Sequence, residues 1–160
     1  MEHETHAQAA MRLFKSGCNC SQAVLCAYCE ELGMDTETAL RLSSGFGGGM
    51  GRLREVCGAV TGAFMALDLK YASADLTDNA AKAAQYALIQ RYAKAFEGEC
   101  GSIICRELLG LSEKRSVPVP ELRTAQYYKK RPCAELVGLA CELLDAQFGM
   151  AEGAVGNEAP

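Results

Sequence analysis

Cysteine is the residue type in this chain with the most chemistry available to it. The chain has nine cysteines among 160 residues, and a thiolate can bind a metal ion or exchange with a disulfide. Three of them, Cys20, Cys57 and Cys133, fall in the first turn of predicted helices. Because the N–H groups and the dipole at a helix N-terminus stabilise a thiolate, these three are the first candidates for a functional site.

A fourth candidate is Cys105, whose predicted short helix contains little other polar chemistry. Cys100, in a predicted loop just upstream, could replace Cys105 or pair with it, and spacing does not choose between them. Cys26 and Cys29 form a CxxC motif, but this pair lies inside a helix, follows no strand and precedes no histidine. Four cysteines are therefore interpreted as structural: Cys18, Cys26, Cys29 and Cys141.

Three chemistries remain open for the candidate set. Four thiolates can hold zinc, although structural zinc sites usually have two closely spaced ligand pairs. Dispersed cysteines also suit an iron–sulfur cluster, because its ligands can come from distant segments that the fold gathers. The same cysteines could instead form disulfides that switch with redox state, with Cys57 or Cys20 as the attacking thiol of lower pKa.

A glycine-rich segment precedes the predicted helix that begins at Cys57. Its glycines are Gly47, Gly48, Gly49 and Gly51. The segment lacks the Lys-Ser or Lys-Thr of a Walker A motif and follows a helix, so it fits a nucleotide-binding loop poorly. We expect a steric role instead, in which the backbone approaches a cofactor or the Cys57 helix closely and its N–H groups donate to sulfur.

The elements that must position these residues are helical. Apolar residues recur at three-to-four spacing and almost no run alternates as a strand would, which predicts an all-α, single-domain bundle of about six or seven helices with the glycine-rich loop before the central helix. The predicted helices cover residues 4–15, 19–33, 35–43, 57–71, 77–96, 103–109 and 133–148. The segment 112–130 is predicted to be a connector with one helical turn. The helix at 57–71 has almost no charge before Asp68, which indicates the bundle centre.

Length and composition set further limits. A chain of 160 residues suits one domain, predicted at 1–148, with a disordered tail at 149–160. The net charge is −4 with the basic residues interpreted as scattered, so nucleic acid is not an expected partner. No apolar run approaches the roughly 20 residues of a membrane span. The first twenty residues lack a signal-peptide pattern, so a cytoplasmic location is expected, and the many small and apolar residues would suit a homodimer.

Several motifs together resemble the C_GCAxxG_C_C family of redox-active proteins over roughly residues 8–145. They are Gly17-Cys18-Asn19-Cys20-Ser21-Gln22-Ala23-Val24, Phe46-Gly47-Gly48-Gly49-Met50-Gly51, Cys57-Gly58-Ala59-Val60-Thr61-Gly62-Ala63, and Cys105 followed by Leu108-Leu109-Gly110. The resemblance implies that Cys20, Cys57, Cys105 and Cys133 are the defining cysteines and that the other five are extras. The family is similar to part of split-Soret cytochrome c, a haem protein that also carries an iron–sulfur cluster. This chain has no CxxCH motif, so covalent haem is not implied.

The expected function is therefore redox activity without an identified substrate. In the leading hypothesis Cys20, Cys57, Cys105 and Cys133 bind an iron–sulfur cluster, of the [2Fe–2S] type, and transfer single electrons to an unknown redox partner protein. Gly47, Gly48, Gly49 and Gly51 would lie beside that cofactor. The alternatives are a thiol–disulfide protein that uses the same cysteines without metal, and a zinc-binding or scaffold module.

Overall fold

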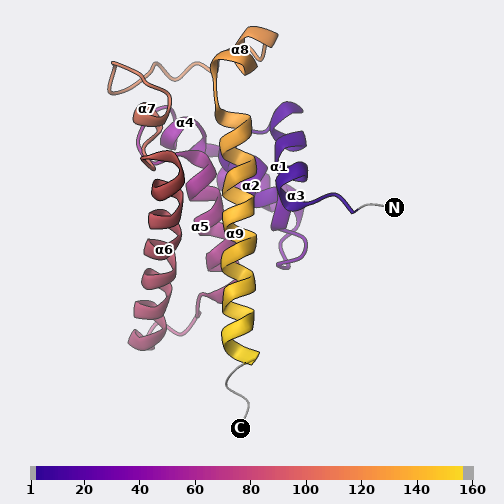
Figure 1. The fold of residues 1–160 in the computed structure, drawn as a ribbon, viewed down its shortest axis with the longest axis vertical. Coiled ribbons are helices and arrows are strands. Elements are labelled where there is room, and N and C mark those ends of the chain that lie inside the picture. Colours follow the sequence, from indigo (N-terminus) through magenta and orange to yellow (C-terminus); the bar gives the residue numbers. More distant parts are fainter. Residues whose placement is uncertain (1–2, 157–160) are drawn as a thin grey trace.

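The computed structural model describes residues 3–156 and shows an all-α single domain (Figure 1). Its longer helices are α1 (His6–Lys15), α2 (Cys20–Tyr28), α3 (Thr36–Ser43), α5 (Gly58–Tyr71), α6 (Asn79–Cys100) and α9 (Cys133–Gly156). The shorter ones are a 3₁₀ turn (Ser44–Phe46), α4 (Gly47–Met50), α7 (Cys105–Leu108) and α8 (Ala125–Lys130). Within residues 3–156 the only β pairing is an isolated bridge, and no helix is long and apolar enough to cross a membrane.

Polar side chains define where the helices begin. The side chain of Asn19 accepts a hydrogen bond from the N–H of Gln22, and the Gln22 side chain accepts one from the N–H of Asn19. Asp35 and Asp78 cap α3 and α6 in the same way, through the N–H groups three residues further on. Each cap satisfies N–H groups that have no partner inside the helix, so these starts follow from local sequence.

Helix α5 lies at the centre of the bundle, as its composition predicts. It packs against α2, α6 and α9, and most of its residues are buried. A Cβ atom at Gly62 would lie 2.7 Å from the backbone oxygen of Ser21, so only glycine allows α2 and α5 to approach this closely. Tyr28 and Tyr92 then join α2 and α6 to α9, because their hydroxyls donate to backbone oxygens of α9 at 3.0 and 2.7 Å.

Three helix ends differ from the sequence-based expectation. Helix α6 does not stop near residue 96: it passes through Gly98 and ends at Cys100, where the C-cap Gly101 has a left-handed φ of 84°. Helix α2 ends at Tyr28, and the residues before Gly33 form turns. Helix α9 continues to Gly156, so residues 149–156 of the predicted disordered tail are helical, while 157–160 lie outside the described residues.

Candidate functional site: a four-cysteine cavity

The fold brings the four candidate cysteines to one cavity of about 360 Å³. Each of them lies where a helix begins: Cys20 is the first residue of α2, Cys57 the N-cap of α5, Cys105 the first residue of α7 and Cys133 the first residue of α9. Figure 1 shows α4, α7 and the first turn of α9 at the same end of the molecule, beneath α8. The thiols of four dispersed segments therefore converge.

A short antiparallel contact ties together the segments that carry Cys57 and Cys105. Val56 pairs with Ile104, the N–H of Cys57 donates to the oxygen of Ile103 at 2.8 Å, and the N–H of Cys105 donates to Glu55 at 2.6 Å. This pairing keeps Ile104 extended, so α7 starts at Cys105 and not at residue 103 as expected. All four cysteines, rather than three, consequently occupy helix starts.

The glycine-rich segment forms one wall of the cavity. Gly47, Gly48, Gly49 and Gly51 all line it, and the backbone from Gly48 to Gly51 is a left-handed turn with φ between 65° and 70°. A Cβ atom at Gly49 would lie 2.5 Å from the Cβ of Cys105. The expected close approach is therefore present, and it is made to the start of α7.

Three residues after or within this turn are also left-handed although they carry side chains. They are Met50, Arg52 and Arg54, with φ of 70°, 65° and 60°. Such a conformation costs roughly 1–2 kcal/mol per residue and persists only where the surrounding structure enforces it. Here the enforced backbone places both Arg52 and Arg54 against the cavity.

Arg54 is the buried cation of the site. Only 3% of its surface is exposed, its Nη1 lies 3.6 Å from the sulfur of Cys105, and its Nε donates to Ser116 at 2.9 Å. Its Nη2 is buried and finds no hydrogen-bond partner among the described residues. A buried charge is costly unless an opposite charge compensates it, so this position favours an anionic neighbour.

The cavity lining as a whole is electropositive. Arg52, Arg123 and Arg131 line it together with Arg54, whereas Glu121 is its one carboxylate among the described residues. Glu121 contacts Arg131 and lies 3.9 Å from Arg52. Sequence reasoning missed these arginines; the only local signal is that Arg52 and Arg54 follow the glycines directly.

Positive charge and a neighbouring thiol act on the pKa of Cys133. Cys20 donates a hydrogen bond to the sulfur of Cys133, and this bond, followed by the charges of nearby arginines, holds the pKa of Cys133 below its ordinary value. The same hydrogen bond, together with burial, raises the pKa of Cys20 well above that value. Within this pair, Cys133 is the thiol that ionises first.

Burial dominates at the other two cysteines of the cavity. It raises the pKa of Cys57 to about 12, although N–H groups at the start of α5 partly offset the effect. Burial also raises the pKa of Cys105, against the lowering influence of Arg54. The expectation that Cys57 or Cys20 is the thiol of lowest pKa is therefore wrong, because the helix terminus alone does not outweigh burial.

The other five cysteines do not line the cavity: Cys18, Cys26, Cys29, Cys100 and Cys141. Cys100 is the last residue of α6, at the opposite terminus of a helix from the four site cysteines. The structure thus separates Cys105 from Cys100, which sequence spacing could not do. All nine cysteines are free thiols.

The donor set fits an iron–sulfur cluster chemically. Four thiols share one cavity with four arginines that compensate thiolate charge, and glycine leaves room where a Cβ would collide. The volume falls within the roughly 300–1,000 Å³ typical of small-molecule sites. Within the described residues, no three His, Cys, Asp or Glu side chains are already grouped as ligands of a single metal ion.

Comparison with known proteins identifies a family for this chain. Searches among curated proteins and among solved structures found no significant match. One family model, described as "Putative redox-active protein (C_GCAxxG_C_C)", matches residues 18–147, a range that contains all four cysteines of the cavity. The chain therefore belongs to the C_GCAxxG_C_C family of redox-active proteins.

Proposed function

We propose that Cys20, Cys57, Cys105 and Cys133 bind an iron–sulfur cluster, of the [2Fe–2S] type, and that the protein transfers single electrons. The observation that carries this proposal is the convergence of four thiols from four helix starts on one arginine-lined cavity. A pair of thiols would suffice for a disulfide switch, whereas four in one cavity match the Cys₄ ligand set of such clusters.

Each part of the cavity has a separate task in this proposal. The four cysteines supply thiolate ligands, and the positive charge of Arg54 and its neighbours favours loss of their protons on binding. The glycine turn keeps side chains out of the space beside Cys105. When bound, the cluster would accept and release one electron at a time.

Anaerobic purification followed by absorption spectroscopy and analysis of iron, sulfide and zinc tests the proposal. We expect a coloured protein with near-stoichiometric iron and sulfide. Cys57→Ser should abolish the colour, because it removes one of the four ligands. Undiminished iron and sulfide in that variant would contradict the ligand role of Cys57.

The matched control is Cys100→Ser. Cys100 is partly buried and lies only five positions before Cys105, but it does not line the cavity. We expect iron and sulfide in this variant to equal those of the unaltered protein. An equal loss of iron and sulfide in the two variants would show that removing any thiol disturbs the fold, and would contradict a specific ligand set. Zinc without sulfide in the unaltered protein would contradict the iron–sulfur cluster.

A second candidate function rests on the hydrogen-bonded pair of Cys20 and Cys133. The Cys133 thiolate would attack a disulfide in a partner, forming a mixed disulfide and releasing one partner thiol. Cys20, after losing its proton, would then attack the Cys133 sulfur and release the second partner thiol. Two protein thiols would thus lose two electrons and two protons, while the partner disulfide is reduced to a dithiol.

Free-thiol counting separates the two functions. The disulfide function predicts colourless protein in which mild oxidation removes two titratable thiols, both lost from Cys20 and Cys133. Cys133→Ser would then leave Cys20 free and abolish the change. Retention of all thiols in iron-free protein after exposure to an excess of a small disulfide would contradict this candidate.

A further inference from the structure

The segment that covers the cavity has a charge opposite to that of the whole protein. Residues 112–131 contain six basic and two acidic residues, a net charge of +4 in a chain whose total is −4. The basic ones are Lys114, Arg115, Arg123, Lys129, Lys130 and Arg131, and we call residues 112–131 the basic end. The interpretation of the basic residues as scattered is therefore wrong for this segment.

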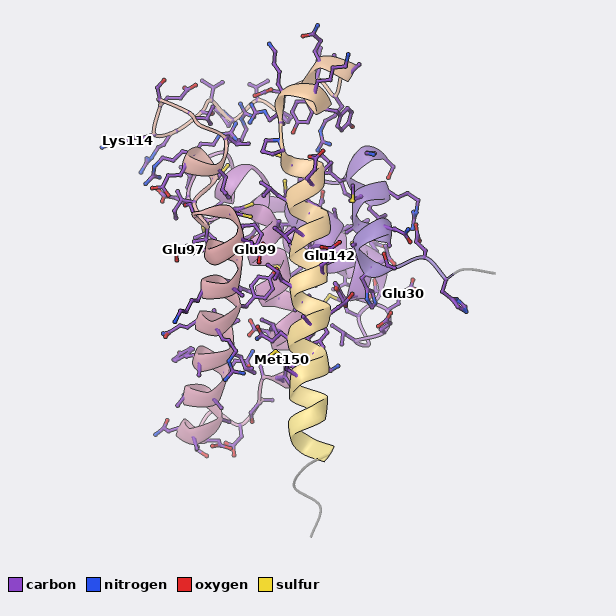
Figure 2. All side chains as sticks on the ribbon, viewed as in Figure 1. Glu30, Glu97, Glu99, Lys114, Glu142 and Met150 are labelled. Atoms are coloured by element: carbon purple, nitrogen blue, oxygen red, sulfur yellow. The ribbon has the colours of Figure 1, made fainter. Side chains whose placement is uncertain are left out.

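Four cations of the basic end are unpaired and exposed. Lys114, Arg115, Lys129 and Lys130 are exposed to solvent and form no ion pair within residues 3–156. Figure 2 shows Lys114 projecting away from the helices beside the connector, whereas Glu97 and Glu99 lie lower, along α6. These four positive charges therefore lie on the same segment whose other residues line the cavity.

The same segment exposes an apolar centre. Val117, Val119 and Leu122 are 69%, 63% and 84% exposed. Pro118 and Pro120, which alternate with the two valines, line the cavity from the inner side. The prolines of this segment therefore contact the cavity, while the valines between them are exposed to solvent. The same stretch of chain thus lines the thiol cavity and presents apolar side chains at the surface.

Polar bonds from the body of the protein hold the segment in place. Arg52 donates to the oxygen of Val117 at 2.7 Å and Arg54 to Ser116 at 2.9 Å. Arg123 donates to the oxygens of Phe14 and Cys18, both at 3.0 Å. The segment is therefore a fixed part of the cavity wall. Its bonds to the body of the protein do not involve the exposed side chains of Val117 and Val119.

We propose that the basic end is the docking surface for an acidic electron-transfer protein. An apolar centre with charged residues around it is the usual composition of a transient interface, and redox encounters are commonly small. The positive charge would speed association with a negatively charged partner. A partner seated on Val117 and Val119 would lie across one segment from the four thiols, which is why this inference rests on the proposed electron transfer.

Titration with an acidic flavodoxin tests the surface independently of the cofactor. Metal-free reduced protein and oxidised flavodoxin are titrated at low and at high salt, with a basic cytochrome c as the probe of opposite charge. We expect flavodoxin binding that weakens about tenfold at high salt, and much weaker binding of the cytochrome. Absence of flavodoxin binding at low salt, or equal binding of the two probes, overturns the proposal.

Charge reversal locates the binding surface. Lys129→Glu with Lys130→Glu should weaken flavodoxin binding about tenfold. The control, Lys82→Glu with Arg91→Glu, makes the same change in net charge at exposed positions of α6 and should change the affinity less than twofold. Equal effects of the two pairs would indicate net charge alone and overturn the docking surface; circular dichroism verifies that the variants are folded.

Two further measurements separate the outcomes. Sedimentation of the protein alone tests whether a second copy occupies the surface. Oligomers that dissociate in the double variant Lys129→Glu, Lys130→Glu would overturn the proposal. Electron transfer from reduced flavodoxin to cluster-loaded protein tests the proposed function: each event moves one electron from the flavin to the protein. Flavodoxin binding without electron transfer would support the docking surface and contradict the proposed electron-transfer function. Electron transfer that is unaffected by Lys129→Glu with Lys130→Glu would support the function and contradict the docking surface.

Discussion

Cys133 and Cys141 lie two turns apart on α9 and are both buried, yet their surroundings differ. The hydrogen bond from Cys20 and the charges of nearby arginines lower the pKa of Cys133, the first residue of the helix. Cys141 is inside the helix, and burial raises its pKa to about 12. The difference shows that a hydrogen bond from a second thiol and nearby arginines, rather than the degree of burial or a helix start alone, lower the pKa of a buried cysteine.

The contrast extends to the backbone around the two cysteines. The cavity end contains the left-handed turn from Gly48 to Gly51 and two left-handed arginines, whereas α9 around Cys141 is regular helix. Strain and uncompensated positive charge are thus concentrated at the end where the thiols converge. The helical body supplies the stability that permits this arrangement.

The largest expected effect is that of Gly49→Ala. The new Cβ would lie 2.5 Å from the Cβ of Cys105 and 2.8 Å from the Cα of Arg54, at a φ of 68° that disfavours any side chain. We expect the free energy of unfolding of the metal-free protein to fall by roughly 2–4 kcal/mol. Urea unfolding measures it, and a loss below 0.5 kcal/mol would contradict the close packing of the turn against α7.

Alkaline pH should distinguish the two environments with a smaller effect. Because the pKa of Cys141 is raised in the folded state, the unfolded state loses its proton first, and stability falls as pH rises from about 9 toward 12. Cys141→Ala removes this contribution. The stability difference between the unaltered protein and the variant should therefore shrink by roughly 1 kcal/mol per pH unit above pH 9.

Cys133→Ala should show the opposite sign. The lowered pKa of Cys133 means that the folded state loses its proton first, so the thiolate adds stability as pH rises toward 9 and this stability is lost as pH falls through the folded-state pKa. The difference between the unaltered protein and Cys133→Ala should grow over that interval. Parallel urea titrations of reduced protein from pH 6 to 11 check both signs, and two pH-independent differences would remove the proposed contrast.

Much of this contrast could be predicted from the sequence, because helix starts are local. Asn19, Asp35 and Asp78 have the side chains that cap helices, and the structure places each at an N-cap. The cap at Asn19 also predicts that Cys20 lies at a helix start. The near-absence of charge before Asp68 likewise predicts that the helix at 57–71 is central, and most residues of α5 are buried.

Other parts of the site depend on contacts between distant segments. The start of α7 at Cys105 depends on the pairing of Ile104 with Val56, which no local pattern indicates. In sequence, Arg54 resembles any surface arginine, and its burial beside Cys105 follows only from the left-handed turn and the bond to Ser116. The position of this buried charge therefore follows only from the structure. The four site cysteines, in contrast, can be identified from the sequence, by their places on predicted helices and by the family resemblance.

Arg131→Gln should sharpen the comparison at the level of charge. Arg131 is the first among the arginines that lower the pKa of Cys133, so its removal should decrease the thiolate fraction. We expect iodoacetamide to alkylate Cys133 about threefold more slowly at pH 7. Peptide mass spectrometry of metal-free protein measures the rate, with Arg106→Gln as a control outside the cavity; equal rates in all three proteins would exclude Arg131 as the cause.

The smallest expected effect comes from a glycine of the helical body. Gly98 lies inside α6, its φ is not in the left-handed region, and a Cβ there would meet no atom within 4 Å. Gly98→Ala should therefore raise the free energy of unfolding by about 0.5–1 kcal/mol, because alanine loses less backbone entropy in a helix. The same substitution is thus expected to change the free energy of unfolding in opposite directions at Gly98 and at Gly49. If urea unfolding shows that Gly98→Ala destabilises the protein, the division between a regular helical body and a strained cavity end does not hold on α6.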